Sequence, residues 1–144
     1  MEVKELHRGR LIDHIQLVVS DFQRSQRFYR AIFEALGTPF GGAGDDWFFV
    51  DELFVSAQTS QAAQGKLTGP THLAFQAADR EAVDRFHRAG IEAGGSNNGA
   101  PGIRPYHPGY YAAFLLDPDG NNIEAVHHGP AERSAASVKL TFPS

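Results

Sequence analysis

The sequence predicts an α+β fold made of two similar modules, each with the order strand–helix–strand–strand–strand. The first observation is an internal repeat: LIDHIQLVVSDFQRSQRFYRA, which begins at Leu11, returns as GPTHLAFQAADREAVDRFHRA from Gly69 with an offset of 58 residues. The second is that each copy runs from a strand-like apolar stretch into a segment with helical spacing of apolar residues. Further strand-like segments follow both copies. A duplicated module therefore accounts for most of the chain.

The length and composition fit one soluble domain. The chain has 144 residues, with thirteen Lys and Arg against seventeen Asp and Glu, and a net charge of −4. A chain of this size buries roughly 70% of its unfolded surface, so a hydrophobic core is available without disulfides. The mildly acidic charge argues against a nucleic-acid partner. The absence of cysteine excludes disulfides and thiolate chemistry.

The sequence gives no reason to expect a membrane partner. No apolar run approaches the roughly 20 residues that a membrane-spanning helix needs. The segment MEVKELHRGR at the start of the chain carries charges of both signs and no apolar stretch, so it does not resemble a secretory signal. We therefore expect a cytoplasmic protein.

The first module is expected at about residues 10–59. A strand at 11–19 leads into a helix that the Asp21 carboxylate can cap and that Gly37 can end. Ser20 with Gln23 is an alternative capping box. A short strand at 38–41 and a hairpin with arms at 47–50 and 53–57 complete the module.

The second module is expected at about residues 69–128, after a polar linker at 60–68, so that residues 1–128 form one domain. A strand at 71–77 leads into a helix that Asp79 can cap and that stops near Gly90. The glycine- and proline-rich stretch 94–109 is expected to be mostly loop, with a short strand at 103–107. Strands at 110–116 and 122–128 flank a DPDG turn. In the tail, residues 129–144, apolar alternation could add an edge strand or pack on a partner.

Two histidines occupy equivalent positions in the two repeats and face away from the predicted core. Alternation along a strand places His14 on the face opposite Ile15 and Leu17. The same alternation places His72 opposite Leu73. If the repeats pack with pseudo-symmetry, the two imidazoles can converge.

Glu124 is a carboxylate inside the apolar strand NNIEAVHH, where it is costly unless a cation or hydrogen bonds meet it. Two histidines and one carboxylate from three strands suit divalent iron, manganese, cobalt, nickel or zinc, and they leave coordination positions open. The ordinary alternatives are a hydrogen-bonded core histidine and a glutamate paired with arginine. Both readings stay open on the residues alone.

The chain resembles the vicinal oxygen chelate superfamily, also called the glyoxalase, bleomycin-resistance and extradiol dioxygenase superfamily. The matching stretches are IDHIQLVVSDFQRSQRFYRAIFEALG, THLAFQA with its helix, and GYYAAFLLDPDGNNIEAVHH, of which DPDGNNIE is the most specific. The resemblance implies a glyoxalase-like fold in which two βαβββ modules wrap a cupped mixed sheet around a divalent metal. It carries the metal-ligand role to His14, His72 and Glu124.

The chain departs from the family pattern on the last strand of the first module, where lactoylglutathione lyases offer a metal-binding glutamate. The strand LFVSAQT offers only Ser56 and Gln58 as polar candidates. This departure argues against a glyoxalase I reaction with two metal-bound glutamates. The remaining ligand set looks more like that of the dioxygenases or fosfomycin-resistance enzymes, although the chain has two modules rather than the four of full-size extradiol dioxygenases.

The resemblance implies a metal-dependent lyase, isomerase or dioxygenase that acts on a small oxygenated substrate. Glu124 is a catalytic candidate, and Tyr110 or Tyr111, on or next to the penultimate strand, could orient substrate or donate a proton. Arg104 could meet an anionic substrate or be a solvated loop charge. The alternative functions are a bleomycin-resistance type protein that sequesters an antibiotic, and a stress or regulatory protein with a vestigial site. A homodimer is expected, as the family commonly forms.

Overall fold

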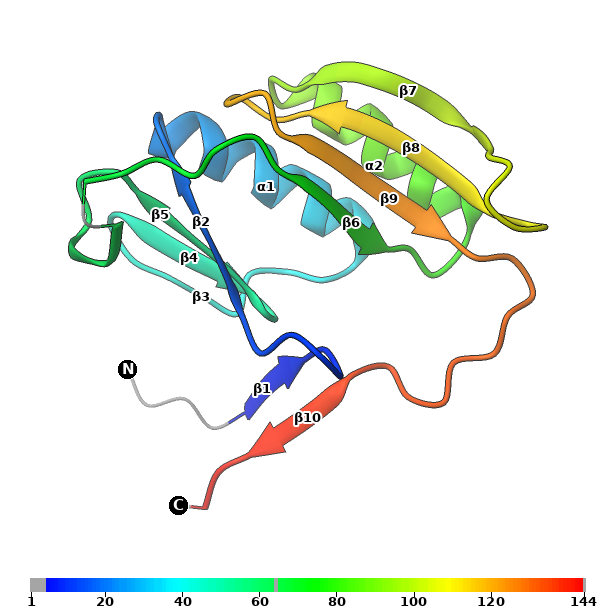
Figure 1. The fold of residues 1–144 in the computed structure, drawn as a ribbon, viewed down its shortest axis with the longest axis horizontal. Helices are drawn as coiled ribbons and strands as arrows, with labels where there is room; N and C mark the ends of the chain where they lie inside the picture. Colours follow the sequence, from blue (N-terminus) through cyan, green and yellow to red (C-terminus); the bar gives the residue numbers. More distant parts are fainter. Residues whose placement is uncertain (1–4, 64, 144) are drawn as a thin grey trace.

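The computed structural model of the chain, which describes residues 5–63 and 65–143, confirms the α+β class and the two modules (Figure 1). Each module forms a mixed four-stranded sheet in which the first strand pairs in parallel with the last and the other pairs are antiparallel. The first module contains β2 (Ile15–Val19), α1 (Phe22–Leu36), β3 (Gly42–Ala43), β4 (Trp47–Val50) and β5 (Leu53–Ala57), in the sheet order β2-β5-β4-β3. The second contains β6 (His72–Gln76), α2 (Arg80–Glu92), β7 (Ser96–Ile103), β8 (Tyr111–Leu116) and β9 (Asn122–His127), in the order β6-β9-β8-β7.

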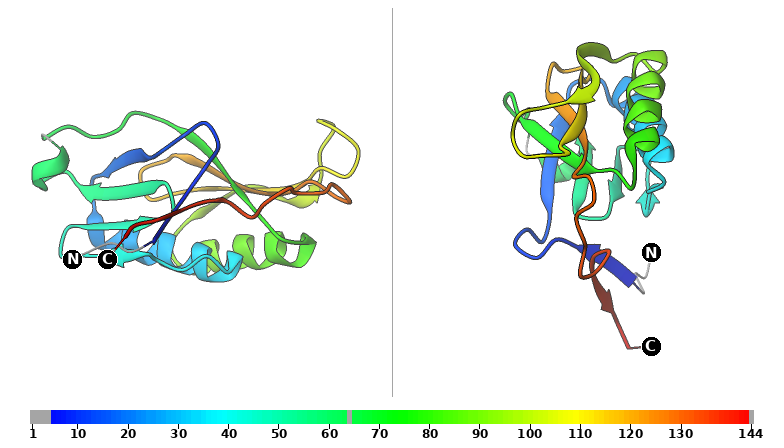
Figure 2. Two further views of the ribbon diagram at one scale, coloured as in Figure 1. Left: turned by 90° about the horizontal axis from the view of Figure 1, so that it is seen from below. Right: turned by 90° about the vertical axis from the view of Figure 1, so that its right-hand side faces the viewer.

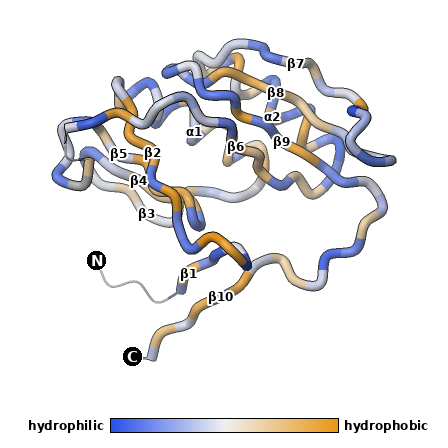
Figure 3. The backbone as a smooth tube through the Cα atoms, in the orientation of Figure 1, coloured by the Kyte–Doolittle hydropathy of each residue, from blue (hydrophilic) through white to orange (hydrophobic). Residues whose placement is uncertain are grey.

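Both helices lie on one side of the two sheets, so that each sheet has a helix face and a free face (Figure 2). Hydrophobic residues run along β2, β8 and β9, and hydrophilic residues gather in the connections (Figure 3). One core spans both modules between helices and sheets; its fully buried members include Leu17, Phe28, Phe48, Phe86, Leu115 and Ile123. The free faces are therefore where polar site residues can gather.

The helices begin where the sequence predicts. The Asp21 carboxylate accepts a hydrogen bond from the Arg24 amide at 3.1 Å, and Asp79 accepts one from the Ala82 amide at 2.7 Å. Ser20 does not form the alternative capping box, since its hydroxyl binds Asp119 in the β8–β9 turn. Side-chain capping satisfies amides that have no partner in the first turn of a helix.

The two helices exchange a matching pair of contacts. Arg27 of α1 donates from Nη2 to the Glu92 carbonyl at 3.1 Å, and Arg85 of α2 donates from Nε to the Ala35 carbonyl at 3.4 Å. Each guanidinium therefore meets a carbonyl in the last turn of the other helix, where carbonyls lack intrahelical partners. The two arginines are related by the same 58-residue offset as the repeats.

The second helix ends at Glu92, two residues beyond Gly90 and close to the predicted stop. A Cβ at Gly90 would lie 2.2 Å from Leu115 Cδ1 and 3.1 Å from Ile32 Cγ2. The glycine is needed for close packing of the helix on the core rather than for ending the helix.

The stretch 94–109 is not mostly loop, because residues 96–103 form β7. The pairing of β7 with β8 shifts register between Asn97 and Gly99 and again between Gly99 and Gly102. Glycine-rich strands with bulges lack the apolar alternation that marks a strand in the sequence. The loop that remains, residues 104–110, connects β7 to β8.

The predicted tail strand exists as β10 (Val138–Thr141), and its partner is β1 (Glu5–Arg8), which the sequence did not predict. The two strands form a separate antiparallel ribbon, with Leu6 opposite Leu140. The polar linker contains a 3-10 turn, Gln61–Ala63. Within the described residues, no helix is both long and apolar enough to cross a membrane.

Candidate active site

The free face of the second sheet brings together His72, Glu124 and Tyr110. His72 opens β6 and Glu124 lies in the middle of the neighbouring strand β9. The His72 Nε2 atom lies 2.9 Å from Glu124 Oε1, and the Tyr110 hydroxyl donates a hydrogen bond to Glu124 Oε2. Both oxygens of this carboxylate therefore have a partner, as a buried carboxylate requires.

Glu124 and His72 differ in how far they are buried. Glu124 is 3% exposed, whereas the His72 side chain is 51% exposed and can reach solvent or a ligand. Ile123 and Ala125, the neighbours of Glu124 on β9, point to the core, as strand alternation predicts. Phe114, directly opposite Glu124 on β8, packs its ring edge-on at 6.1 Å from the His72 ring.

The site raises the pKa of Tyr110 to about 12, because of burial first and then the hydrogen bond to Glu124 and its charge. The positive charge of Arg104 acts in the opposite direction on the same phenol. Tyr110 therefore stays protonated at neutral pH and serves as a hydrogen-bond donor.

A contact between two imidazoles joins the loop 104–110 to the residue that follows β9. His107 Nε2 lies 2.9 Å from His128 Nδ1, and both rings pack edge-on against the Tyr110 ring. Backbone contact between Gly109 and Gly129 lies beside this pair: a Cβ on Gly109 would lie 3.3 Å from the Gly129 Cα. These contacts hold Tyr110 in position over Glu124.

Glu124→Gln is expected to lower the pKa of Tyr110, because the variant loses the negative charge that disfavours the phenolate. The measurement is a pH titration of tyrosine ring carbons by NMR. Tyr111 provides the matched control: its pKa is raised by a hydrogen bond to Asp84, so it should shift in Asp84→Asn and not in Glu124→Gln. An unchanged Tyr110 titration in Glu124→Gln would show that the contact does not form in solution.

Tyr111 does not join the site. Its hydroxyl donates to Asp84 Oδ1 at 2.7 Å, and the Arg80 guanidinium lies 4.9 Å from its ring centre, so its side chain meets α2. Of the two adjacent tyrosines, only Tyr110 meets Glu124.

His14 also lies apart from the cluster. It precedes β2 rather than lying mid-strand as predicted, and its side chain is 64% exposed. Its Nδ1 lies 2.7 Å from Asp13 Oδ1, and this hydrogen bond lowers the pKa of Asp13. Over residues 5–63 and 65–143, no three His, Cys, Asp or Glu side chains gather closely enough to hold a metal ion. The single chain thus assembles two of the three predicted ligands.

The first sheet offers no carboxylate at the position that departs from the family pattern. Ser56 on β5 is fully buried and accepts a hydrogen bond from Gln16 Nε2 at 3.1 Å. The free face of this sheet instead carries nearly parallel rings of Trp47, Phe49 and Phe54, with centres 6.3 and 6.1 Å apart. This part of the surface suits flat apolar groups.

His128 belongs to the site although the sequence favoured only a solvated strand end there. It lies four residues after Glu124, directly beyond the end of β9. Continued strand alternation is the signal that could have placed it on the same face as Glu124. Its partner His107 lies in a loop, where no periodic pattern predicts direction.

The comparisons with known proteins agree with this fold. The family model of the Glyoxalase/Bleomycin resistance protein/Dioxygenase superfamily matches residues 11–125. A glyoxalase/bleomycin resistance protein from Albidiferax ferrireducens T118 is 32% identical, with a TM-score of 0.65, over 81% of this chain and 98% of its own. A search of curated proteins finds no match.

Two further solved structures are similar in fold alone. A glyoxalase-related enzyme from Fulvimarina pelagi is 22% identical, with a TM-score of 0.66, over 94% of this chain and 99% of its own. Lactoylglutathione lyase from Agrobacterium tumefaciens is 19% identical, with a TM-score of 0.57, over 82% of this chain and 93% of its own.

Proposed function

Because the chain belongs to the glyoxalase/bleomycin resistance protein/dioxygenase superfamily, we propose that it is a metal-dependent enzyme acting on a small oxygenated substrate. The observation that carries the proposal is the pairing of His72 Nε2 with Glu124 Oε1 at 2.9 Å around a buried carboxylate. The reaction class is that of a lyase, isomerase or dioxygenase.

The donor chemistry fits a divalent ion. An imidazole nitrogen and a carboxylate oxygen that lie 2.9 Å apart are of the donor types that suit iron, manganese, cobalt, nickel or zinc. Burial of Glu124 favours a cation beside it, since the carboxylate loses most of its hydration. A bound ion would supply Lewis-acid stabilisation of negative charge on adjacent substrate oxygens. Tyr110 would orient Glu124 and present a phenol proton next to it.

The third ligand, His14, is proposed to come from a second copy of the chain in a homodimer. Within one chain the His14 side chain is largely exposed and does not join His72 and Glu124. An exposed imidazole could bind a metal ion on another copy once it leaves Asp13.

We expect stoichiometric divalent metal in protein purified without chelator, and loss of that metal in His72→Ala and Glu124→Ala. Metal content by plasma mass spectrometry checks this. His87→Ala is the matched control, because His87 lies on α2 and binds Asn97. Metal retained in Glu124→Ala would refute the proposed ligand set.

Antibiotic binding that chelator does not change would favour sequestration. The Trp47, Phe49 and Phe54 rings offer a surface for such binding.

Metal content measured on mixed dimers shows which copy of the chain supplies His14 to each site. His14→Ala and Glu124→Ala chains should each lack metal alone. A mixed dimer regains one complete site if His14 crosses to the other copy, and regains none if each site lies within one chain.

A further inference from the structure

We propose that Arg104 binds a carboxylate group of the substrate, so that the site selects small carboxylic acids whose other oxygens reach His72 and Glu124. The inference rests on the proposed function, because it places the substrate beside this pair. It concerns the class of substrate rather than the presence of the metal.

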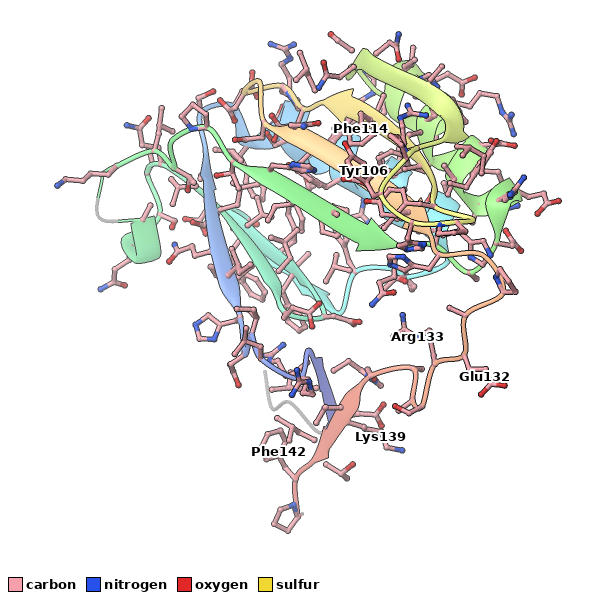
Figure 4. All side chains as sticks on the ribbon, turned by 45° about the vertical axis from the view of Figure 1, so that its right-hand side comes forward. Tyr106, Phe114, Glu132, Arg133, Lys139 and Phe142 are labelled. Atoms are coloured by element: carbon pink, nitrogen blue, oxygen red, sulfur yellow. The ribbon has the colours of Figure 1, made fainter. Side chains whose placement is uncertain are left out.

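Arg104 lies on the same free face as the pair. Its guanidinium carbon is 5.3 Å from the ring centre of Phe114, and Phe114 is the cross-strand neighbour of Glu124 and an edge-on contact of His72. Figure 4 shows Phe114 and Tyr106 over the same part of the second sheet. The Phe114 side chain therefore lies between the Arg104 guanidinium and the candidate ligands His72 and Glu124. A small molecule is long enough to reach across one aromatic ring.

The guanidinium is held in place before any ligand arrives. Its Nη2 donates to the Ala100 carbonyl at 2.8 Å, and the Arg104 amide donates to the Tyr110 carbonyl at 2.8 Å. A Cβ at Gly99 would lie 3.2 Å from Nη2, and a Cβ at Gly102 would lie 3.2 Å from Nη1. The glycines of the bulged strand β7 thus leave room for this side chain. A preorganised cation loses less conformational entropy on binding.

Among residues 5–63 and 65–143, no carboxylate forms an ion pair with Arg104. The ion pairs in the described parts of the chain involve Arg8 and histidines, while Glu124 is occupied by His72 and Tyr110. A guanidinium carries five N–H donors in a planar fork that matches a carboxylate. The nearby Glu124 carboxylate disfavours a dianionic phosphate, so a monoanion fits better.

The test compares mandelate with mandelamide, which differ in charge and little in size. Isothermal titration on metal-free protein and on protein with Mn²⁺ should show tighter binding of mandelate by the wild type. In Arg104→Gln, mandelate should bind about tenfold more weakly while mandelamide is little affected. Arg104→Lys should fall between, since lysine keeps the charge without the planar fork. The matched control is Arg88→Gln, an equal change of charge on exposed α2 surface.

Equal binding of acid and amide by the wild type, or an unchanged preference in Arg104→Gln, would overturn the proposal, as would the absence of mandelate binding in both forms of the protein. The two proposals fail separately. If Arg104→Gln loses the preference for mandelate over mandelamide but the wild type contains no metal, only the metal site is refuted. Stoichiometric metal with no effect of Arg104→Gln would refute the carboxylate site alone.

Discussion

Asp117→Ala is expected to destabilise the protein by about 3 kcal/mol or more, because it removes the acceptor at the centre of a buried polar cluster. Asp117 is 4% exposed, and its carboxylate accepts hydrogen bonds from the Tyr29 hydroxyl at 2.5 Å and the Asn121 amide group at 2.9 Å. It also accepts from the backbone amides of Asp119 and Asn121. Alanine leaves the buried Tyr29 and Asn121 donors, and the part-buried Asp119 amide, without their acceptor.

Urea denaturation of the wild type and of Asp117→Ala measures this loss of free energy of unfolding. Asp45→Ala is the control, because Asp45 is exposed and its replacement should change the free energy of unfolding by no more than about 0.5 kcal/mol. Comparable values for both variants would mean that the cluster contributes little. The cluster also reaches the candidate site, since Asn121 Oδ1 accepts the Thr71 amide immediately before His72.

The free energy of unfolding is expected to fall above about pH 10 at up to about 1.4 kcal/mol per pH unit from Tyr29 alone. Burial, followed by the charge and hydrogen bond of Asp117, raises the pKa of Tyr29 well above its ordinary value. The phenol therefore ionises in the unfolded chain before it ionises in the folded one. Its contribution is fully present below about pH 10 and is lost as pH rises toward the folded pKa.

Urea denaturation between about pH 8 and about pH 11 checks this slope against Tyr29→Phe. The variant should be less stable at neutral pH, because Asp117 loses a donor, but its stability should fall less steeply at high pH. Tyr110 and Tyr111 titrate in both proteins, so the difference isolates Tyr29. Parallel curves would show that Tyr29 is not buried in solution.

Local signals in the sequence predicted those elements that local physics determines. Capping by Asp21 and Asp79, the glycine end of α1 and the hairpin of β4 and β5 all follow from neighbouring residues. The ribbon of β1 and β10 could not be found this way, because pairing between segments so far apart in sequence leaves no local pattern. The strand that precedes β8 was predicted at 103–107 but lies at 96–103, because the glycines of the bulged strand β7 look like loop residues.

The candidate site was predictable to the same degree. Strand alternation placed Glu124 and His72 on the free face, and the parallel pairing of β6 with β9 brings them into contact. The choice between Tyr110 and Tyr111 needed the start of β8, which the sequence does not mark. The position of His14 depended on a strand boundary, which is the least certain feature of a pattern.

The reciprocal arginine contacts between α1 and α2 suggest an origin for the unequal modules. A half-length ancestor that associated with itself would have made this contact twice, as isologous interfaces do. Fusion of two copies would then have produced two equivalent ligand positions in a single polypeptide. Once joined, the copies were free to diverge, and Phe54 now lies opposite Gln16 at the place where Glu124 lies opposite Ala74 in the second sheet.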